Sequence, residues 1–312
     1  MEGYSLIRSL REMLNEPTGS SFMNDRTSYD NLYHAVQDFN VRTHFATSNQ
    51  VIAITANVAS YELNADYCGL ALTDIYNRPY VKHTYNGSDT FIFNTEYSSV
   101  VLNNDTSTAA VAQQFAITDA TQLDNITGTA TSTIAQSNGE SILIDTAADF
   151  SGVAVGDYIH NTTDDSNGIV IKITSATQII CALFEGTLNS WTIADAYVIT
   201  PQTRYNIVLS PTPSDTATLT VPYIVKPTPV YSPYRSYKLP SDAMLPIVHY
   251  AAFLYKFRDS EPDFGNAFYK SYDMFARKVA AEIRKAIPGK SGFRVNMSKM
   301  NKRSTGAGAW SV

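Results

Sequence analysis

The chain has 312 residues, of which 44% are hydrophobic and 17% are charged, and its formal net charge at pH 7 is −6. These values are typical of a globular protein and exclude a largely disordered chain. The longest mostly apolar stretch, residues 244–255, is shorter than the roughly 20 residues of a membrane-spanning helix, so we expect no membrane span. Cys68 and Cys181 lie far apart, so we expect neither a disulfide framework nor a zinc site, and a reducing cytosol suits them.

The start of the chain predicts two amphipathic helices. Apolar residues recur at helical spacing over residues 4–15, and the opening sequence lacks the basic and apolar regions of a secretory signal, so we interpret it as a helix of the mature protein. A second helix is expected from about residue 28 to residue 42, with Ser28 as its N-cap.

Residues 50–118 consist of short runs rich in Val, Ile, Thr and Tyr, separated by Asn-Gly and Asn-Asp pairs. The runs VIAITANVASYEL and TFIFNTEYSSVVL predict strands and hairpins. Residues 70–80 are interpreted as irregular, because Pro79 argues against a central strand.

Residues 128–200 differ in composition from the rest, with eight carboxylates and Lys172 as the only basic residue. The runs SILID, DYIH, GIVIKIT, QIICALF and AYVIT predict five short strands joined by polar turns. We therefore expect a small, closed β-sandwich or barrel.

The last part of the ordered chain predicts one hairpin, one extended segment and two helices. YNIVL and ATLTVPYIV flank the turn-like SPTPSD, and the Pro- and Tyr-rich residues 227–242 are expected to be extended. A helix to residue 258, capped by Ser241 or Asp242, is followed by one over residues 263–287 that is roughly 38 Å long at 1.5 Å per residue.

Charge is divided unevenly along the sequence. Residues 1–240 carry 23 acidic and 11 basic side chains, whereas residues 241–312 carry 6 acidic and 12 basic ones. Such a split indicates a basic arm that meets an acidic partner or nucleic acid.

The tail, residues 288–312, has five basic residues and no acidic one. Phe293, Val295 and Met297 alternate with polar residues such as Arg294, which gives an extended segment one apolar and one polar face. Because a lone strand has no backbone partners, we expect it to add to the sheet edge of another subunit. The alternative is a loose, solubilising tail.

Motifs for catalysis or metal binding are weak. PGKSG lacks the upstream glycine of a phosphate-binding loop, and NTTDDSNG lacks the ligand spacing of a calcium loop, so a helix terminator and an Asx-stabilised turn explain them better. The five histidines lie in separate segments. Carboxylates of the 128–200 region could form a glycosidase-like pair, but a solvated acidic face is the better interpretation; the three considered are Asp145, Asp149 and Asp157. No cofactor or metal is expected.

Three segments resemble the head-to-tail connector, or adaptor, proteins of tailed bacteriophages. They are SLIRSLREML with SYDNLYHAVQDF, the segment RYNIVLSPTPSDTATLTVPYIVKPTPV, and LPSDAMLPIVHYAAFLYKFRDSEPDFGNAFYKSYDMFARKVAAEI. The run SILIDTAADFSGVAVGDYIHNTTDDSNG is similar to small β-modules found in phage structural proteins.

The resemblance implies a structural, non-enzymatic virion protein at the head–tail interface, assembled in the host cytoplasm. It implies a ring, commonly of twelve copies, that joins the portal to the tail nozzle, tube or fibres and lets double-stranded DNA pass. It also implies that the tail docks on the portal, and the residues we assign to this are Phe293, Arg294, Val295, Met297, Lys299 and Trp310. The alternatives are a β-rich receptor- or glycan-binding tail protein, possibly hydrolytic, and a DNA-binding protein that uses the tail.

The expected fold is α+β. A helical adaptor core, made of the N-terminal helix pair and the two C-terminal helices with β-hairpins, would carry a small inserted all-β sandwich or barrel and an extended tail. The expected boundaries are 1–127 and 201–287 for the two parts of the core, 128–200 for the insert and 288–312 for the tail.

Overall fold

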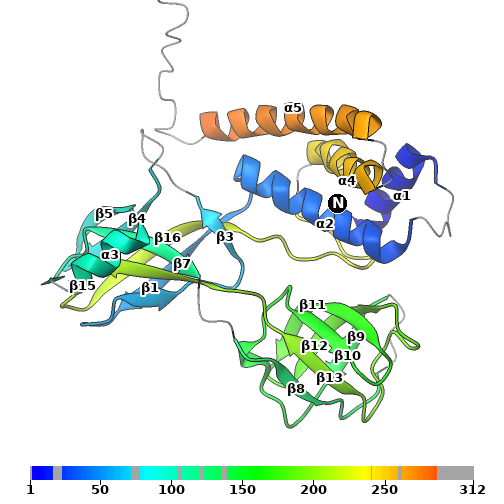
Figure 1. Ribbon diagram of the computed structural model, residues 1–312, viewed down its shortest axis with the longest axis horizontal. Coiled ribbons are helices and arrows are strands. Elements are labelled where there is room, and N and C mark those ends of the chain that lie inside the picture. The colour runs from blue at the N-terminus through cyan, green and yellow to red at the C-terminus, as the bar shows by residue number, and fades with distance from the viewer. Residues whose placement is uncertain are drawn as a thin grey trace, which may run out of the picture.

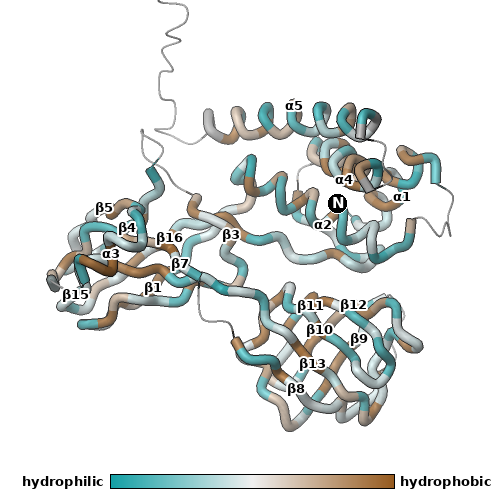
Figure 2. Tube along the Cα trace, viewed as in Figure 1, coloured by the Kyte–Doolittle hydropathy of each residue, from teal (hydrophilic) through white to brown (hydrophobic). Residues whose placement is uncertain are grey.

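The chain folds into a helical unit, an eight-stranded sheet and a six-stranded sheet (Figure 1). The computed structural model describes residues 2–16, 23–71, 78–104, 107–119, 123–134, 139–239, 241–258 and 262–286. Hydrophobic positions recur through all three parts (Figure 2).

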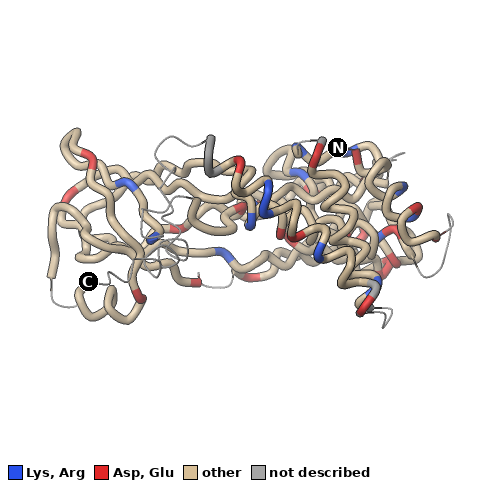
Figure 3. Tube along the Cα trace, turned by 90° about the horizontal axis from the view of Figure 1, so that it is seen from above, with Lys and Arg blue, Asp and Glu red and all other residues tan. Residues whose placement is uncertain are grey.

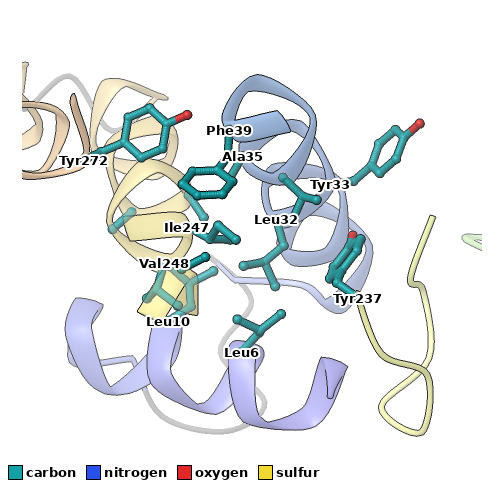
Figure 4. Close-up of a cluster of buried hydrophobic side chains, with 14 of the residues drawn as sticks. Leu6, Leu10, Leu32, Tyr33, Ala35, Phe39, Tyr237, Ile247, Val248 and Tyr272 are labelled. Atoms are coloured by element: carbon teal, nitrogen blue, oxygen red, sulfur yellow. The ribbon is translucent and has the colours of Figure 1, made fainter. Parts of the chain in front are cut away.

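The helical unit brings together helices from both ends of the chain, which confirms the four helices predicted from apolar spacing. They are α1 (Gly3–Leu14), α2 (Asp25–Thr43), α4 (Met244–Arg258), which follows the short 3₁₀ turn Ser241–Ala243, and α5 (Pro262–Ala286). All four contribute to one core, in which Leu6, Phe39 and Ile247 are fully buried (Figure 4). Each helix is stabilised by this shared apolar face more than by its own propensity.

The start of α2 differs from the prediction. Asn24 is the N-cap, and its side chain accepts a hydrogen bond of 2.7 Å from the backbone N of Thr27. Ser28 lies inside the helix, where its Oγ donates to the backbone O of Asn24. Asn24 caps the helix because its amide oxygen satisfies an amide of the first turn that has no partner within the helix.

The eight-stranded sheet is assembled from distant parts of the chain in the order β1-β16-β4-β5-β7-β14-β2, and β3 also pairs with β16. Strand β16 pairs with three strands, β1, β3 and β4, and is antiparallel to each, whereas β5 is parallel to β7. The strand bounds are β1 Thr47–Ile54, β2 Ser60–Glu62, β3 Tyr67–Leu70, β4 Tyr80–Tyr85, β5 Ser88–Asn94, β7 Gln114–Asp119, β14 Tyr205–Ser210 and β16 Ala217–Val225. The Gln50 side chain bridges β1 to the backbone O of Glu62 on β2, so the two ends of the sheet approach each other.

The six-stranded sheet lies within residues 126–200 and has the order β8-β13-β10-β11-β12-β9. The strands are β8 Ile126–Thr129, β9 Ser141–Ile144, β10 Tyr158–Asn161, β11 Ser166–Ser175, β12 Gln178–Phe184 and β13 Ala196–Thr200, with a short 3₁₀ turn at Phe150–Gly152. The backbone N of Thr131, just after β8, donates to the backbone O of Ile144 on β9. The five strands predicted in this region are confirmed, and β8 joins them.

The predicted fold class is wrong. The described chain is mostly β, with a near-closed barrel-like sheet and a half-barrel accompanied by five helices, and it is not a helical core that carries a small inserted β-module. The error arose because the strands of the eight-stranded sheet pair across long sequence separations. Local periodicity shows that a strand exists but not which strand it meets.

Two local predictions are also wrong. The hairpin expected at SPTPSD does not form, because β14 pairs with β7 and β2 while β16 pairs with β1, β3 and β4. Between them, β15 (Thr212–Pro213) pairs with β6 (Thr108–Ala109). The run YSSVVL, expected as strand, is helix α3 (Tyr97–Asn104), which packs on the sheet through Val100. Tertiary packing overrides β-propensity there.

The strap, residues 226–239, connects the three parts. Tyr231 donates to the Asp30 carboxylate on α2, and its ring lies 5.8 Å from the rings of both Tyr29 and Phe184. Arg235 forms an ion pair with the buried carboxylate of Glu140 next to β9. The six-stranded sheet is therefore held against the helical unit by one apolar cluster and by charged contacts.

Candidate functional site: the outer face of the eight-stranded sheet

The eight-stranded sheet has one buried face and one face that is open over several strands. Its buried face contributes Val81, Ile92 and Leu219 to a core cluster. The opposite face carries, in one row across four strands, Val51, Thr220, Lys82 and Phe91. Half-covered antiparallel sheets normally expose polar side chains, but here Val51 is 68% exposed and Phe91 is 56% exposed.

An aromatic cluster lies at the β4–β5 end of this row. The ring centroid of Tyr80 lies 5.3 Å from that of Phe91 and 6.3 Å from that of Phe93. The guanidinium carbon of Arg78 lies 4.5 Å from the centroid of Phe93. The packed rings hold Phe91 in a defined, solvent-facing position, which is a property of aromatic anchors at protein interfaces.

Helix α3 continues the apolar surface beside β5. Val100 is buried against Ala116 of β7 and Val208 of β14, so the helix covers only that side of the outer face. Its other apolar side chains face outward, and Leu102 is 70% exposed. We call the surface formed by Val51, Tyr80, Phe91, Phe93, Tyr97, Val101 and Leu102 the outer sheet face.

Few charges interrupt the outer sheet face. Lys82 Nζ lies 3.1 Å from Asp89 Oδ2, and Thr84 Oγ1 donates to Asp89 Oδ1 at 2.6 Å. Hydrogen bonds from Thr84 and Lys82 hold the pKa of Asp89 below its ordinary value. Charged residues are visibly sparser over the half of the molecule that contains this sheet than over the helices (Figure 3). An apolar, locally neutral surface of this kind is typical of a protein–protein interface.

A second candidate is an open groove of about 760 Å³ beside α1. Its polar groups pair with one another: Arg11 Nη2 lies 3.1 Å from Asp25 Oδ1, and Arg8 Nε lies 2.8 Å from Glu12 Oε1. The groove is lined by Tyr4, Ile7, Arg8, Arg11, Glu12, Asn15, Glu16, Asp25, Tyr29 and Pro233. The Arg11–Asp25 pair links α1 to the start of α2, whereas the Arg8–Glu12 pair lies within α1.

The carboxylates weighed as a glycosidase pair take part in local structure. Asp145 accepts from the Tyr197 hydroxyl at 2.8 Å, and Asp149 accepts from the backbone N of Ser151. Asp157 accepts from the backbone N of both Ala154 and Gln202, and burial raises its pKa. Asp145 thus binds a strand side chain, Asp149 and Asp157 bind backbone amides, and all three contacts lie within or next to their own sheet.

The remaining motifs also have structural explanations within the described residues. Asn161 Oδ1 accepts from the backbone N of Thr163 and Asp164, which confirms the predicted Asx turn in NTTDDSNG. No group of three or more His, Cys, Asp or Glu side chains in the described part of the chain is placed to hold a metal ion. None of the described helices is long and apolar enough to cross a membrane. PGKSG and the predicted portal-docking residues Phe293, Arg294, Val295, Met297, Lys299 and Trp310 lie outside the described residues.

The outer sheet face was missed in the sequence, although one signal for it was present. In TFIFN, Phe91 and Phe93 alternate with Ile92, so both faces of the strand are apolar. A strand that is apolar on both faces needs a second covering layer. Family models scanned against the chain give no match, and a search of curated proteins gives none either.

Proposed function

We propose that the protein is a structural component of a tailed-bacteriophage virion. Its copies assemble into a ring that joins the portal at the capsid vertex to the tail, and double-stranded DNA passes through the lumen. The observation that carries the proposal is the outer sheet face, because exposed apolar side chains that recur over β1, β5 and α3 favour a protein partner.

The distribution of exposed apolar side chains supports assembly into a ring. The outer sheet face lies on the eight-stranded sheet, whereas Phe257 and Met274 are exposed on the helical unit. Two unlike surfaces on one chain favour head-to-tail contacts, and such contacts give a closed ring when the rotation between copies closes.

Charge supports passage of DNA without tight binding. The first 240 residues carry 23 acidic and 11 basic side chains. DNA binding depends on Lys and Arg contacts to phosphates, so a lumen formed by this part of the chain would repel the duplex and not retain it.

The proposal is tested by imaging the purified full-length chain by negative-stain electron microscopy, alone and with the portal protein of the same virion. We expect rings that stack on the portal. A protein that stays monomeric at all concentrations, both alone and with the portal, would contradict the proposal.

A pair of variants tests the role of the outer sheet face. Val51→Ser with Phe91→Ser should weaken assembly by about 30- to 800-fold, since each removes an apolar anchor worth roughly 1–2 kcal/mol. Ile193→Ser is the control, because Ile193 is 66% exposed but lies outside the outer sheet face, in the turn that precedes β13 of the six-stranded sheet. Mass photometry across a dilution series gives the assembly constants. If the control weakens assembly as much as the double variant does, the outer sheet face is not the assembly surface.

A further inference from the structure

Strand β5 has an edge to which no described residue is hydrogen-bonded over most of its length. On one side, β5 pairs with β4 from Ser88 to Phe93. On the other side, it pairs with β7 only at Phe93 and Asn94. The side chains of Ser88, Asp89, Thr90 and Phe91 are all exposed, which agrees with an edge that no described strand covers.

The backbone alternation identifies which groups face this edge. The N of Asn94 donates to Pro79 O on the β4 side at 3.0 Å, whereas the N of Thr95 donates to Phe115 O on the β7 side at 2.8 Å. Successive strand residues point their backbone groups to opposite sides. The N–H and C=O of Asp89 and Phe91 therefore point away from β4, toward the open edge.

An open edge with an exposed aromatic residue is a template for another strand. Native proteins usually protect such edges with charges, prolines or a covering element. The one charged residue here, Asp89, has its carboxylate engaged by Lys82 and Thr84 on the β4 side. The turn that precedes β5, Asn86-Gly87 with positive φ at both residues, fixes the hairpin and so keeps this edge in place.

The chain itself contains a segment that fits the edge. α5 ends at Ala286, and the residues beyond it extend to Val312. At about 3.3 Å per residue, the connection from Ala286 to Ser291 spans up to roughly 17 Å, so the segment can reach a copy that packs close to the end of α5. Residues 293–298 alternate apolar and polar side chains, so Phe293, Val295 and Met297 would share one face of an extended strand.

Charge favours the same pairing. The tail has five basic residues and no acidic one, and the wider region 47–119 carries seven acidic and two basic side chains. Next to β5 itself the charges are balanced, since Lys82 pairs with Asp89, so the attraction comes from the wider sheet. Complementary charge steers association and fixes orientation more than it adds affinity.

We propose that residues 291–298 of one copy pair as a strand with the open edge of β5, Ser88–Ile92, in the next copy. The added strand places its apolar side chains beside Phe91 and extends the outer sheet face. This inference rests on the proposed ring and gives the tail a partner within it, in place of the portal expected from the sequence.

Two complementary variants test the pairing. A chain truncated after Ile287 keeps the edge and lacks the tail, whereas Phe91→Pro keeps the tail and lacks an edge N–H. We expect each variant alone to associate about 100-fold or more weakly than the full chain, since several backbone hydrogen bonds are lost. Mixed together, they should form one-to-one heterodimers and nothing larger, as measured by native mass spectrometry.

Controls separate pairing from folding. Phe91→Ser keeps the backbone N–H and should retain tail pairing better than Phe91→Pro. If Phe91→Pro does not fold, Asp89→Pro takes its place, because it removes the other outward N–H. Amide hydrogen exchange at single-residue resolution should show Asp89 and Phe91 protected in the full-length assembly and unprotected in the truncated chain.

Three outcomes would overturn the inference. The mixed variants could stay monomeric, or the protection of Asp89 and Phe91 could be independent of protein concentration, which would show pairing within one chain. The truncated chain could also form rings like the full-length protein. If that truncated ring no longer captured the portal, the tail would belong to the portal contact and the proposed function would stand without this pairing.

Discussion

The two sheets differ in how their outer faces are covered. In the six-stranded sheet, the outward residues Ile169, Ile171 and Ala182 are buried against Tyr29 of α2 and Tyr231 of the strap. In the eight-stranded sheet, α3 covers the β7 and β14 side, while Val51 and Phe91 remain exposed. One sheet completes its second layer within the chain, and the other leaves it open.

This difference indicates where a partner is needed. The runs GIVIKIT and TFIFN look alike in sequence, because each has consecutive apolar residues that place apolar side chains on both faces of a strand. The outer side chains of GIVIKIT are covered by the strap and α2, so they form a contact within the chain. The second has no such cover among the described residues, and it is therefore the surface that assembly would bury.

The largest expected effect comes from opening the covered face of the six-stranded sheet. Tyr231 is only 6% exposed, bonds to Asp30 and packs between Tyr29 and Phe184. Tyr231→Ala should lower the free energy of unfolding by about 3–4 kcal/mol, because it leaves a cavity where the strap packs between α2 and the six-stranded sheet. Urea denaturation followed by circular dichroism measures the change.

Tyr234→Ala is the matched control for this substitution. Tyr234 lies on the same strap but is 76% exposed. Exposed substitutions of this kind change stability by less than about 0.5 kcal/mol. Equal losses at both positions would mean that the strap is not what covers the six-stranded sheet.

A smaller effect on stability is expected at the ion pair between the strap and the six-stranded sheet. Arg235 Nη2 donates to Glu140 Oε2 at 2.9 Å, and the Glu140 side chain is almost fully buried. Arg235→Ala should lower the free energy of unfolding by about 2 kcal/mol, less than the roughly 3–5 kcal/mol of fully buried pairs, because Arg235 is partly exposed.

A double-mutant cycle checks the cause of that loss. Adding Glu140→Gln to Arg235→Ala removes the buried charge that was left unpaired, so part of the lost stability should return. Strictly additive losses in chemical denaturation would show that the ion pair does not hold the six-stranded sheet to the strap.

The helices and most strands could be predicted because their signals are local. The stripe Leu6, Leu10 and Leu14 of α1 is a helical repeat, and it is buried as expected. Strand pairing could not be predicted in the same way. Thr47 of β1 pairs with Ile224 of β16, far away in sequence, and no periodicity encodes that choice. The fold class was therefore wrong although most elements were right.

The candidate site depends on the same missing information. The alternation in TFIFN shows that Phe91 and Phe93 share a face, but only the sheet order shows that β4, β16 and β1 continue that face without cover. The tail residues chosen from sequence, such as Phe293 and Val295, lie outside the described residues, so their role stays a prediction.

The smallest expected effect is on the pH dependence of stability, which should be greater for the core of the eight-stranded sheet than for that of the six-stranded sheet. His83 of β4 is fully buried, and neither ring nitrogen has a hydrogen-bond partner among the described residues. Burial lowers the pKa of His83, so the folded chain keeps this ring neutral. Below about pH 6.5 the unfolded chain binds a proton that the folded chain does not. The free energy of unfolding therefore decreases as the pH is lowered.

Substitution of His83 should flatten this pH dependence. His83→Leu removes the titrating ring, so urea denaturation between pH 8 and pH 5 should show a shallower decrease than in the natural chain. His34→Leu is the control, because His34 is exposed on α2. Burial also lowers the pKa of His249 on α4, so a residual slope from the helical unit is expected.

At pH 5, amide exchange should increase in β4 and β5 before it increases in the six-stranded sheet. An unchanged slope in His83→Leu would show that the eight-stranded core tolerates the charged ring, and the two sheets would then not differ in their response to acid.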